Sequence, residues 1–185
     1  MTNLTRIENL DCLPRDEMRV LLETYTPEDA ECLFIRARKV RERVYGRAVY
    51  LRGLIEISSY CKNDCYYCGL RKSNQRAQRY RLSKEEILKC CEEGYALGLR
   101  TFVLQGGEDS WFDDERLCDI VHEIRRGWPD CAITLSLGER GRESYAALFE
   151  AGANRYLLRH ETANEKHYQS LHPEELTLRN RLPTN

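Results

Sequence analysis

The stretch that decides the fold is residues 49–68, which read VYLRGLIEISSYCKNDCYYC. Its first half, Val49–Ile57, is rich in β-branched and aromatic residues and predicts a β-strand. Its second half carries Cys61, Cys65 and Cys68 in a C-x3-C-x2-C spacing, directly after the strand. The stretch therefore predicts a strand that leads three closely spaced thiols into the loop at its carboxyl end.

The residues after this loop alternate between helical and strand patterns. Ser83 and Glu86 have capping-box spacing, which predicts a helix start. Apolar residues at helical spacing predict two further helices, around residues 117–124 and 145–149. Three more strands are predicted, at residues 100–104, 132–137 and 155–158. Alternating strands and helices are typical of βαβ units, so we expect an α/β fold with a parallel sheet of about four units.

The length of the chain limits how such units can be arranged. A closed barrel of eight units needs about 250 residues, and the chain has 185. We therefore expect either an open sheet or a barrel truncated to about its first four units. In a half-barrel we expect the inward strand residues to form a broad exposed apolar face, made by Ile55, Ile57, Val103, Leu104, Ile133 and Leu135.

Two helical patterns precede the first strand. One covers residues 14–25, and the second starts at a capping Thr26 followed by Pro27 and ends at Gly46. We therefore divide the chain into an N-terminal helical segment, residues 1–46, and a core, residues 47–185.

Composition excludes several classes of protein. The 29 Lys and Arg residues balance 30 Asp and Glu residues, so a generally basic nucleic-acid-binding surface is excluded. No apolar run approaches the roughly 18 residues of a membrane span. We expect no signal peptide, because the first twelve residues include acidic residues and no apolar core. Nine cysteines, an odd number, fit a disulfide framework poorly. We expect a cytoplasmic protein whose cysteines are thiols or metal ligands.

The cysteine triplet would supply three metal ligands, and this number indicates the kind of metal site. Closed zinc sites and ordinary iron–sulfur cubes take four protein ligands, so three thiolates leave one metal position open for chemistry. The alternatives are buried thiols, or a zinc site completed by another cysteine or a histidine. Gly106 and Gly107 follow the second predicted strand and would let the backbone approach a ligand closely.

In its triplet and strand order, the sequence resembles the radical S-adenosylmethionine (SAM) superfamily. The resemblance implies a TIM-type barrel in which Cys61, Cys65 and Cys68 hold a 4Fe-4S cluster that binds SAM. It also implies that an aromatic residue lies beside the adenine and that a Gly-Gly-Glu motif meets the methionyl group. These positions correspond here to Tyr67, Gly106, Gly107 and Glu108.

Four further motifs resemble the HydE-type maturases of FeFe-hydrogenase: LQGGED, TLSLGE, NRYLLRHETAN and RNRL, within residues 104–182. The resemblance implies that Glu161 and Arg181 contact SAM. It implies a substrate-side lining of Thr134, Arg155 and Arg159. That family is nearly twice as long, and the sequence Pro183-Thr184-Asn185 replaces a helix, so we expect a truncated chain.

The implied reaction is reductive SAM cleavage to a 5'-deoxyadenosyl radical, which acts on a small-molecule or organometallic precursor of the hydrogenase cluster. Implied partners are an electron donor such as ferredoxin or flavodoxin and other hydrogenase maturases, with no nucleic acid and no membrane. The alternatives are a biotin-synthase-like or methylornithine-synthase-like enzyme, a passive iron–sulfur or zinc module, and an inactive iron–sulfur-binding fragment.

Overall fold

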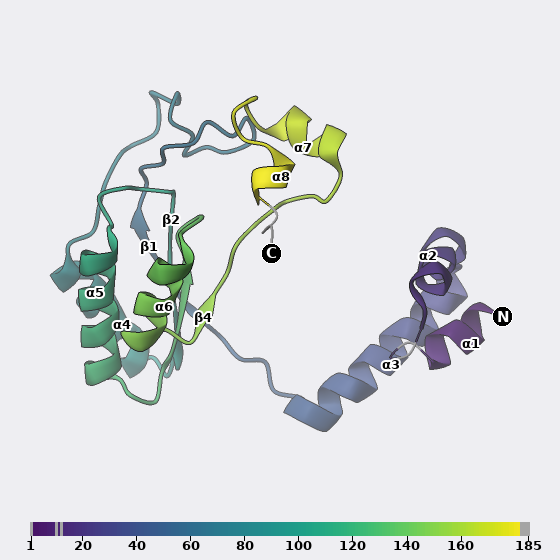
Figure 1. Ribbon diagram of the computed structural model, residues 1–185. Helices are drawn as coiled ribbons and strands as arrows, with labels where there is room; N and C mark the ends of the chain where they lie inside the picture. The colour runs from purple at the N-terminus through teal and green to yellow at the C-terminus, as the bar shows by residue number, and fades with distance from the viewer. Residues whose placement is uncertain (1, 10, 12, 182–185) are drawn as a thin grey trace. The chain divides into compact units, whose positions relative to one another are not determined.

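The computed structural model describes residues 2–9, 11 and 13–181 (Figure 1). It divides into two compact units, Met1–Tyr50 and Leu51–Asn185. Leu182 of the last motif and the expected break at Pro183 lie outside the described residues. Within the described residues, no helix combines the length and the apolar character that crossing a membrane requires.

The described residues of the first unit form three helices: α1 (Asn3–Glu8), α2 (Arg15–Thr24) and α3 (Pro27–Tyr45). Thr26 and Asp29 form a reciprocal capping box at the start of α3, and Gly46 ends the helix with φ of 61°. The prediction of two helices was therefore incomplete. The six-residue helix α1 is too short to show an apolar stripe in the sequence.

The second unit contains a four-stranded parallel sheet in the order β1-β2-β3-β4. The strands are β1 (Gly53–Ser58), β2 (Thr101–Gly106), β3 (Ala132–Ser136) and β4 (Arg155–Tyr156). The connecting helices are α4 (Lys84–Ala96), α5 (Asp114–Gly127) and α6 (Arg142–Glu150), and the chain continues into α7 (Glu165–Leu171) and α8 (Leu178–Arg181). The prediction of four parallel βα units is confirmed.

The strand boundaries differ from the prediction by up to four residues, and the differences at β1 and β4 have a clear cause. The first strand begins at Gly53 rather than Val49, because pairing with β2 starts at the Gly53–Phe102 register pair. The last strand has two residues, since its register pairs with β3 involve only Arg155 and Tyr156. Strand propensity alone does not show where hydrogen-bonding partners end.

The apolar core lies between the sheet and helices α4, α5 and α6, which cover one face of the sheet (Figure 1). Alternate residues of the strands enter this core because side chains of a strand point to opposite faces in turn. The strand residues buried there are Ile55, Ile57, Phe102, Leu104, Ile133 and Leu135. The prediction that Ile55, Ile57, Leu104, Ile133 and Leu135 face a barrel interior was therefore wrong: they pack against the helices.

The opposite face of the sheet is largely polar. Its residues lie in two rungs set by the strand register: Leu54, Val103, Thr134 and Arg155 in one, and Glu56, Gln105 and Ser136 in the next. Leu54 and Val103 are the apolar members of these rungs, and Leu54 is 56% exposed. The expected broad apolar face is therefore absent from the described sheet, and the polar rungs are suited to contact a polar ligand.

Candidate functional site

The loops at the carboxyl ends of the four strands form a cavity of about 180 Å³. This end of a parallel sheet is where binding residues of βα folds gather. Ten of the predicted residues line the cavity: Cys61, Cys65, Tyr67, Cys68, Gly106, Gly107, Glu108, Arg159, Glu161 and Arg181. The structure thus brings together residues that are up to 120 positions apart in the sequence (181 − 61 = 120).

Thr134 and Arg155 do not line this cavity. They are register partners on β3 and β4, in the rung before the one that contains Ser136, which does line it. Arg155 is exposed, whereas Thr134 is only 3% exposed and its hydroxyl has no hydrogen-bond partner among the described residues. The two residues lie on the polar face of the sheet, next to the cavity rather than in its wall.

Cys61, Cys65 and Cys68 are free thiols of intermediate exposure. Burial raises the pKa of the Cys65 thiol, and the charges of Cys61 and Cys68 raise it further. The described residues nevertheless contain no group of three His, Cys, Asp or Glu side chains arranged around a single metal ion. Three thiolates are one fewer than a closed zinc site or an ordinary iron–sulfur cube takes, so a metal centre held by these cysteines would keep one position open.

The loop that carries the cysteines, residues 59–80, is called the cysteine loop. Backbone hydrogen bonds connect it to its surroundings. The Ser59 amide donates to the Tyr80 carbonyl over 3.1 Å, which closes the base of the loop next to β1. The Tyr66 amide donates to the Leu171 carbonyl over 2.9 Å, which joins the loop to the end of α7. The cysteines therefore lie on a loop that is held at its base and at Tyr66, although it has no regular secondary structure.

The loop after β2 lies directly against the cysteine loop at Gly107. A Cβ atom there would lie 2.2 Å from the Tyr60 carbonyl oxygen and 2.7 Å from the Cys61 Cβ. The next amide, of Glu108, donates to the Cys61 Sγ over 3.4 Å. Glycine is therefore required at position 107 because the cysteine loop packs against it. The sequence had instead suggested that a ligand lies close to this backbone.

Glu108 joins a network of charged side chains. Its side chain is 10% exposed and pairs with Lys62 at 3.3 Å and with Arg181 at 3.2 Å. Arg181 also pairs with Glu139 at 3.0 Å and donates from Nε to the Arg159 carbonyl over 2.8 Å. Burial alone would lower the pKa of Arg181, but the two carboxylates outweigh it and raise the pKa. The guanidinium is thus held in place by this chain's own acids.

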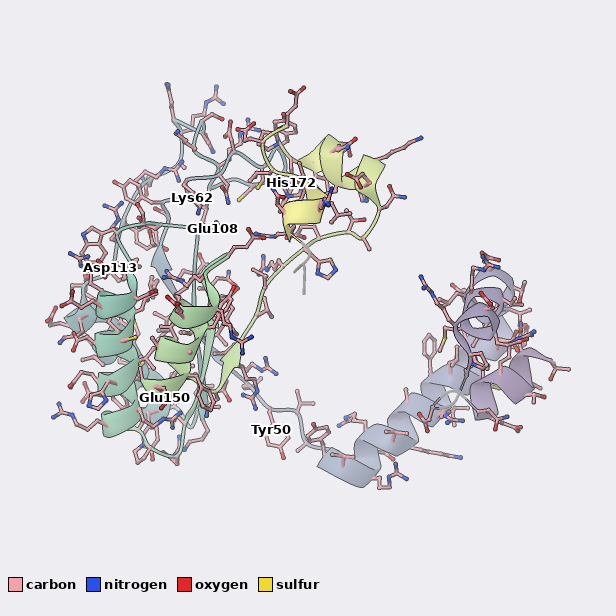
Figure 2. All side chains as sticks on the ribbon, viewed as in Figure 1. Tyr50, Lys62, Glu108, Asp113, Glu150 and His172 are labelled. Carbon is pink, nitrogen blue, oxygen red and sulfur yellow. The ribbon has the colours of Figure 1, made fainter. Side chains whose placement is uncertain are left out.

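Figure 2 shows this charged network near Lys62, Glu108 and His172, at the opposite end of the sheet from Glu150. Gly138 makes room for Glu108: it has φ of 82°, and a Cβ there would come within 1.8 Å of the Glu108 Cγ. A left-handed backbone and a steric limit therefore both favour glycine at this position.

An aromatic group supports Tyr67. The His172 ring lies edge-on to Tyr67, with ring centroids 5.5 Å apart, and stacks on Tyr168 at 3.9 Å. About half of Tyr67 is exposed, yet burial of the rest raises the pKa of its phenol, and the carboxylate of Glu161 raises it further. Glu161 has φ of 64°, a left-handed conformation that is uncommon outside glycine and is often found at binding sites.

Comparison with known proteins decides the family. The model of the radical SAM superfamily matches residues 55–182, which is more than half of the chain. The chain belongs to the radical SAM superfamily.

Two curated relatives of this radical SAM chain have different activities. It is 42% identical over 176 residues to the FeFe-hydrogenase maturase subunit HydE of Thermotoga maritima, covering 92% of this chain and 50% of that protein. It is 34% identical to 3-methylornithine synthase of Methanosarcina acetivorans, covering 86% of this chain and 45% of that protein. The chain thus spans about half the length of the curated relatives it matches.

A crystal structure of methylornithine synthase is similar to this radical SAM chain in fold. The TM-score is 0.80 at 29% sequence identity, and the match covers 98% of this chain and 53% of that one. The structural neighbours are radical SAM enzymes with TIM-type barrels, so the four βα units described here correspond to part of such a barrel.

Sequence reasoning missed several residues at the site of this radical SAM chain. Glu56 and Gln105 line the cavity, where the Gln105 amide donates to Glu56 over 3.0 Å and accepts from Arg159 over 3.1 Å. The sequence could have indicated both, because each is a polar residue within an otherwise apolar strand, at a position that alternates with the buried residues. Lys62 gave no comparable signal, since its partner Glu108 comes from a distant loop. Glu139 lies in the TLSLGE motif, but the sequence gave it no role of its own, since its partner Arg181 is also distant.

Asp109, directly after the Gly-Gly-Glu motif, was also missed as a structural residue. Its carboxylate accepts from the Ser58 hydroxyl over 2.6 Å and from Arg81 over 2.6 and 3.0 Å. Burial would raise the pKa of Asp109, but the hydrogen bonds from Arg81 and Ser58 outweigh it and hold the pKa below its usual value. Asp109 therefore joins the ends of β1 and β2 to the returning cysteine loop.

Gly107→Ala tests the contact between the two loops. The added methyl group would overlap the Tyr60 carbonyl, so we expect a loss of about 2 kcal/mol of folding free energy, measured by urea unfolding. Gly127→Ala is the matched control, because a Cβ at Gly127 meets no atom within 4 Å. Equal stability of the two variants would contradict the tight contact.

Asp109→Asn tests the buried ion pair. At pH 7 we expect a loss of about 2 kcal/mol of unfolding free energy, because Arg81 loses its charged partner. The folded-state pKa of Asp109 is lowered, so its stabilisation is complete above the unfolded-state pKa and is lost as the pH falls through the folded-state pKa. The difference from wild type should therefore shrink as the pH falls below about 4.

The control for this variant is Asp119→Asn, which removes an exposed ion pair with Lys84. We expect its cost to stay below about 0.5 kcal/mol. A difference between Asp109→Asn and wild type that is the same at every pH would show that the charge of Asp109 does not stabilise the fold.

Proposed function

We propose that Cys61, Cys65 and Cys68 of this chain hold the 4Fe-4S cluster of a radical SAM enzyme. Enzymes of the superfamily bind this cluster and SAM. The observation that carries the proposal is that three free thiols line one cavity at the carboxyl ends of the strands.

We infer that SAM occupies the same cavity. The aromatic face of Tyr67, the Gly106–Gly107 backbone, and the Glu161 and Arg181 side chains line it. An aromatic ring suits an adenine, a carboxylate suits ribose hydroxyls or an amino group, and a guanidinium suits a carboxylate. The donor types therefore fit the parts of SAM, which supports the roles that the resemblance implies.

The chemistry divides between the bound groups and the protein. When bound, the reduced cluster supplies the electron that cleaves SAM into methionine and a 5'-deoxyadenosyl radical. Within this chain, Lys62 and Arg181 hold Glu108, and Glu139 holds Arg181, so the polar wall of the cavity is ordered before a ligand arrives. His172 and Tyr168 support the ring of Tyr67. Fixed donors of this kind lower the cost of ordering a ligand.

We further propose that the substrate reaction belongs to maturation of the FeFe-hydrogenase cluster. The 42% identity with HydE over 92% of the chain supports this proposal. Thr134, Arg155 and Arg159 would then contribute polar groups on the substrate side, where the open sheet face carries Glu56, Gln105 and Ser136. An anionic small molecule or organometallic precursor, a ferredoxin or flavodoxin as electron donor, and other maturases are the partners this function would need.

A methylornithine-synthase-like reaction is the second candidate. It is supported by the 34% identity with that enzyme and by the structural match at a TM-score of 0.80. Product analysis with each candidate substrate would distinguish the two reactions.

Cys65→Ser tests the cluster assignment. After anaerobic reconstitution with iron and sulfide, we expect one 4Fe-4S cluster in the wild type and loss of the cluster in the variant, because serine replaces a thiolate ligand. Iron and sulfide analysis and electron paramagnetic resonance would measure both. Cys90→Ser is the control, since Cys90 is exposed on α4, outside the cavity. A full cluster in Cys65→Ser would refute the assignment.

Glu161→Gln and Arg181→Ala test the SAM site. Each removes one charged contact with SAM, so we expect binding of SAM to weaken roughly tenfold or more, with the cluster retained. Arg181→Ala also removes the ion pairs of Arg181 with Glu108 and Glu139, so Glu161→Gln is the cleaner test. Equilibrium dialysis would measure the affinity, and the electron paramagnetic spectrum would report whether SAM perturbs the cluster. Glu150→Gln, at the far end of the sheet (Figure 2), should bind as the wild type does. A spectrum that SAM leaves unchanged would indicate a passive iron–sulfur module.

A further inference from the structure

The Arg79 side chain donates hydrogen bonds to four backbone carbonyls of the cysteine loop. Residues 59–80 form turns and irregular structure, with no helix or strand. The guanidinium of Arg79 donates to the carbonyls of Ser59, Leu70, Arg71 and Asn74, with the last three at 2.9, 2.8 and 3.2 Å. One side chain therefore joins the start of the loop to its middle.

The stretch that Arg79 holds is bonded in turn to the cysteine segment. The Lys72 amide donates to the Asn63 carbonyl over 2.9 Å, and the Ser73 amide donates to the Asp64 carboxylate over 3.0 Å. The Arg71 guanidinium donates to the Tyr66 carbonyl over 3.0 Å. Residues 70–74 are thus a layer between Arg79 and the segment of Cys61, Cys65 and Cys68.

An arginine is suited to this position for a geometric reason. Its planar guanidinium carries five N–H donors in a fixed fork, so it can reach carbonyls on two sides at once. In this structure Nη1 serves Ser59 and Leu70, and Nη2 serves Arg71 and Asn74. A lysine has one nitrogen on a flexible stem and cannot span the same acceptors.

We propose that Arg79 is a positioning residue that holds the cysteine loop in a cluster-ready conformation before iron and sulfide bind. This inference rests on the proposed function, in which the loop receives a 4Fe-4S cluster. Arg79 acts through the backbone and touches neither the cluster ligands' sulfurs nor the cavity, whose lining does not include it. Its effect should therefore appear in the apo-protein as well as in cluster assembly.

The experiment compares wild type with Arg79→Ala, Arg79→Lys and Arg76→Ala. Arg76 is the matched control: it lies in the same loop and is exposed, and none of the side-chain hydrogen bonds or ion pairs of the described residues involves its guanidinium. Hydrogen–deuterium exchange of the apo-proteins measures how well the backbone of the cysteine loop is ordered. Iron and sulfide content after anaerobic reconstitution measures how much cluster is assembled.

We expect exchange of the Lys72 and Ser73 amides to be at least tenfold faster in Arg79→Ala than in wild type. The amides of the β2 and β3 core should be unchanged, and iron content should fall to less than half. Arg79→Lys should lie between these values, and Arg76→Ala should match wild type.

Wild-type exchange and iron content in Arg79→Ala would overturn the inference and leave the proposed function intact. Equally faster exchange in the core and in the loop would also overturn it, because it would indicate a general loss of stability. If Arg79→Ala fails to fold, Arg79→Lys decides by the same criteria. A wild-type chain that assembles no cluster would refute the proposed function, and apo-protein exchange would still decide whether Arg79 orders the loop.

Discussion

The contact between Gly107 and Tyr60 brings two loops closer than any other residue at Gly107 would allow. It fixes the loop after β2 against the cysteine loop and lets the Glu108 amide reach the Cys61 sulfur. Glu108 is thereby placed where Lys62 and Arg181 can pair with it. The cavity, its charged wall and the position of α8 all depend on this close approach, although it involves no ligand and no ion pair of its own.

Local chemistry at the ends of elements was readily predicted from the sequence. Ser83 and Glu86 form the expected capping box, and the Gly106–Gly107 pair lies at the end of a parallel strand beside the cysteines, as expected. Both features depend on residues a few positions apart, where one backbone geometry determines the outcome. The family was also predictable, because the spacing of the cysteines and the strand-end motifs are themselves local patterns, and the match to residues 55–182 confirms it.

Some features that depend on tertiary packing were not predicted. The apolar strand residues were assigned to a barrel interior, but Leu104 and Ile133 pack against helices, because those helices cover the face with the larger apolar side chains. The pairing of Glu139 with Arg181 joins two segments more than forty residues apart (181 − 139 = 42). Periodicity shows that a strand has two different faces, whereas only tertiary packing shows which of them the helices cover.

The Thr134 hydroxyl, which has no hydrogen-bond partner among the described residues, would affect selectivity if the proposed substrate covers this face of the sheet. It is buried on the sheet face that also carries Glu56 and Gln105, which already bond to one another. A molecule that covers this face without offering a hydrogen bond would leave the hydroxyl dry and unpaired, whereas a molecule with a matching group would remove an existing penalty. Discrimination at such a surface comes mainly from what a wrong molecule leaves unsatisfied, and polar sites of this kind reject analogues that lack one group far more strongly than apolar pockets do.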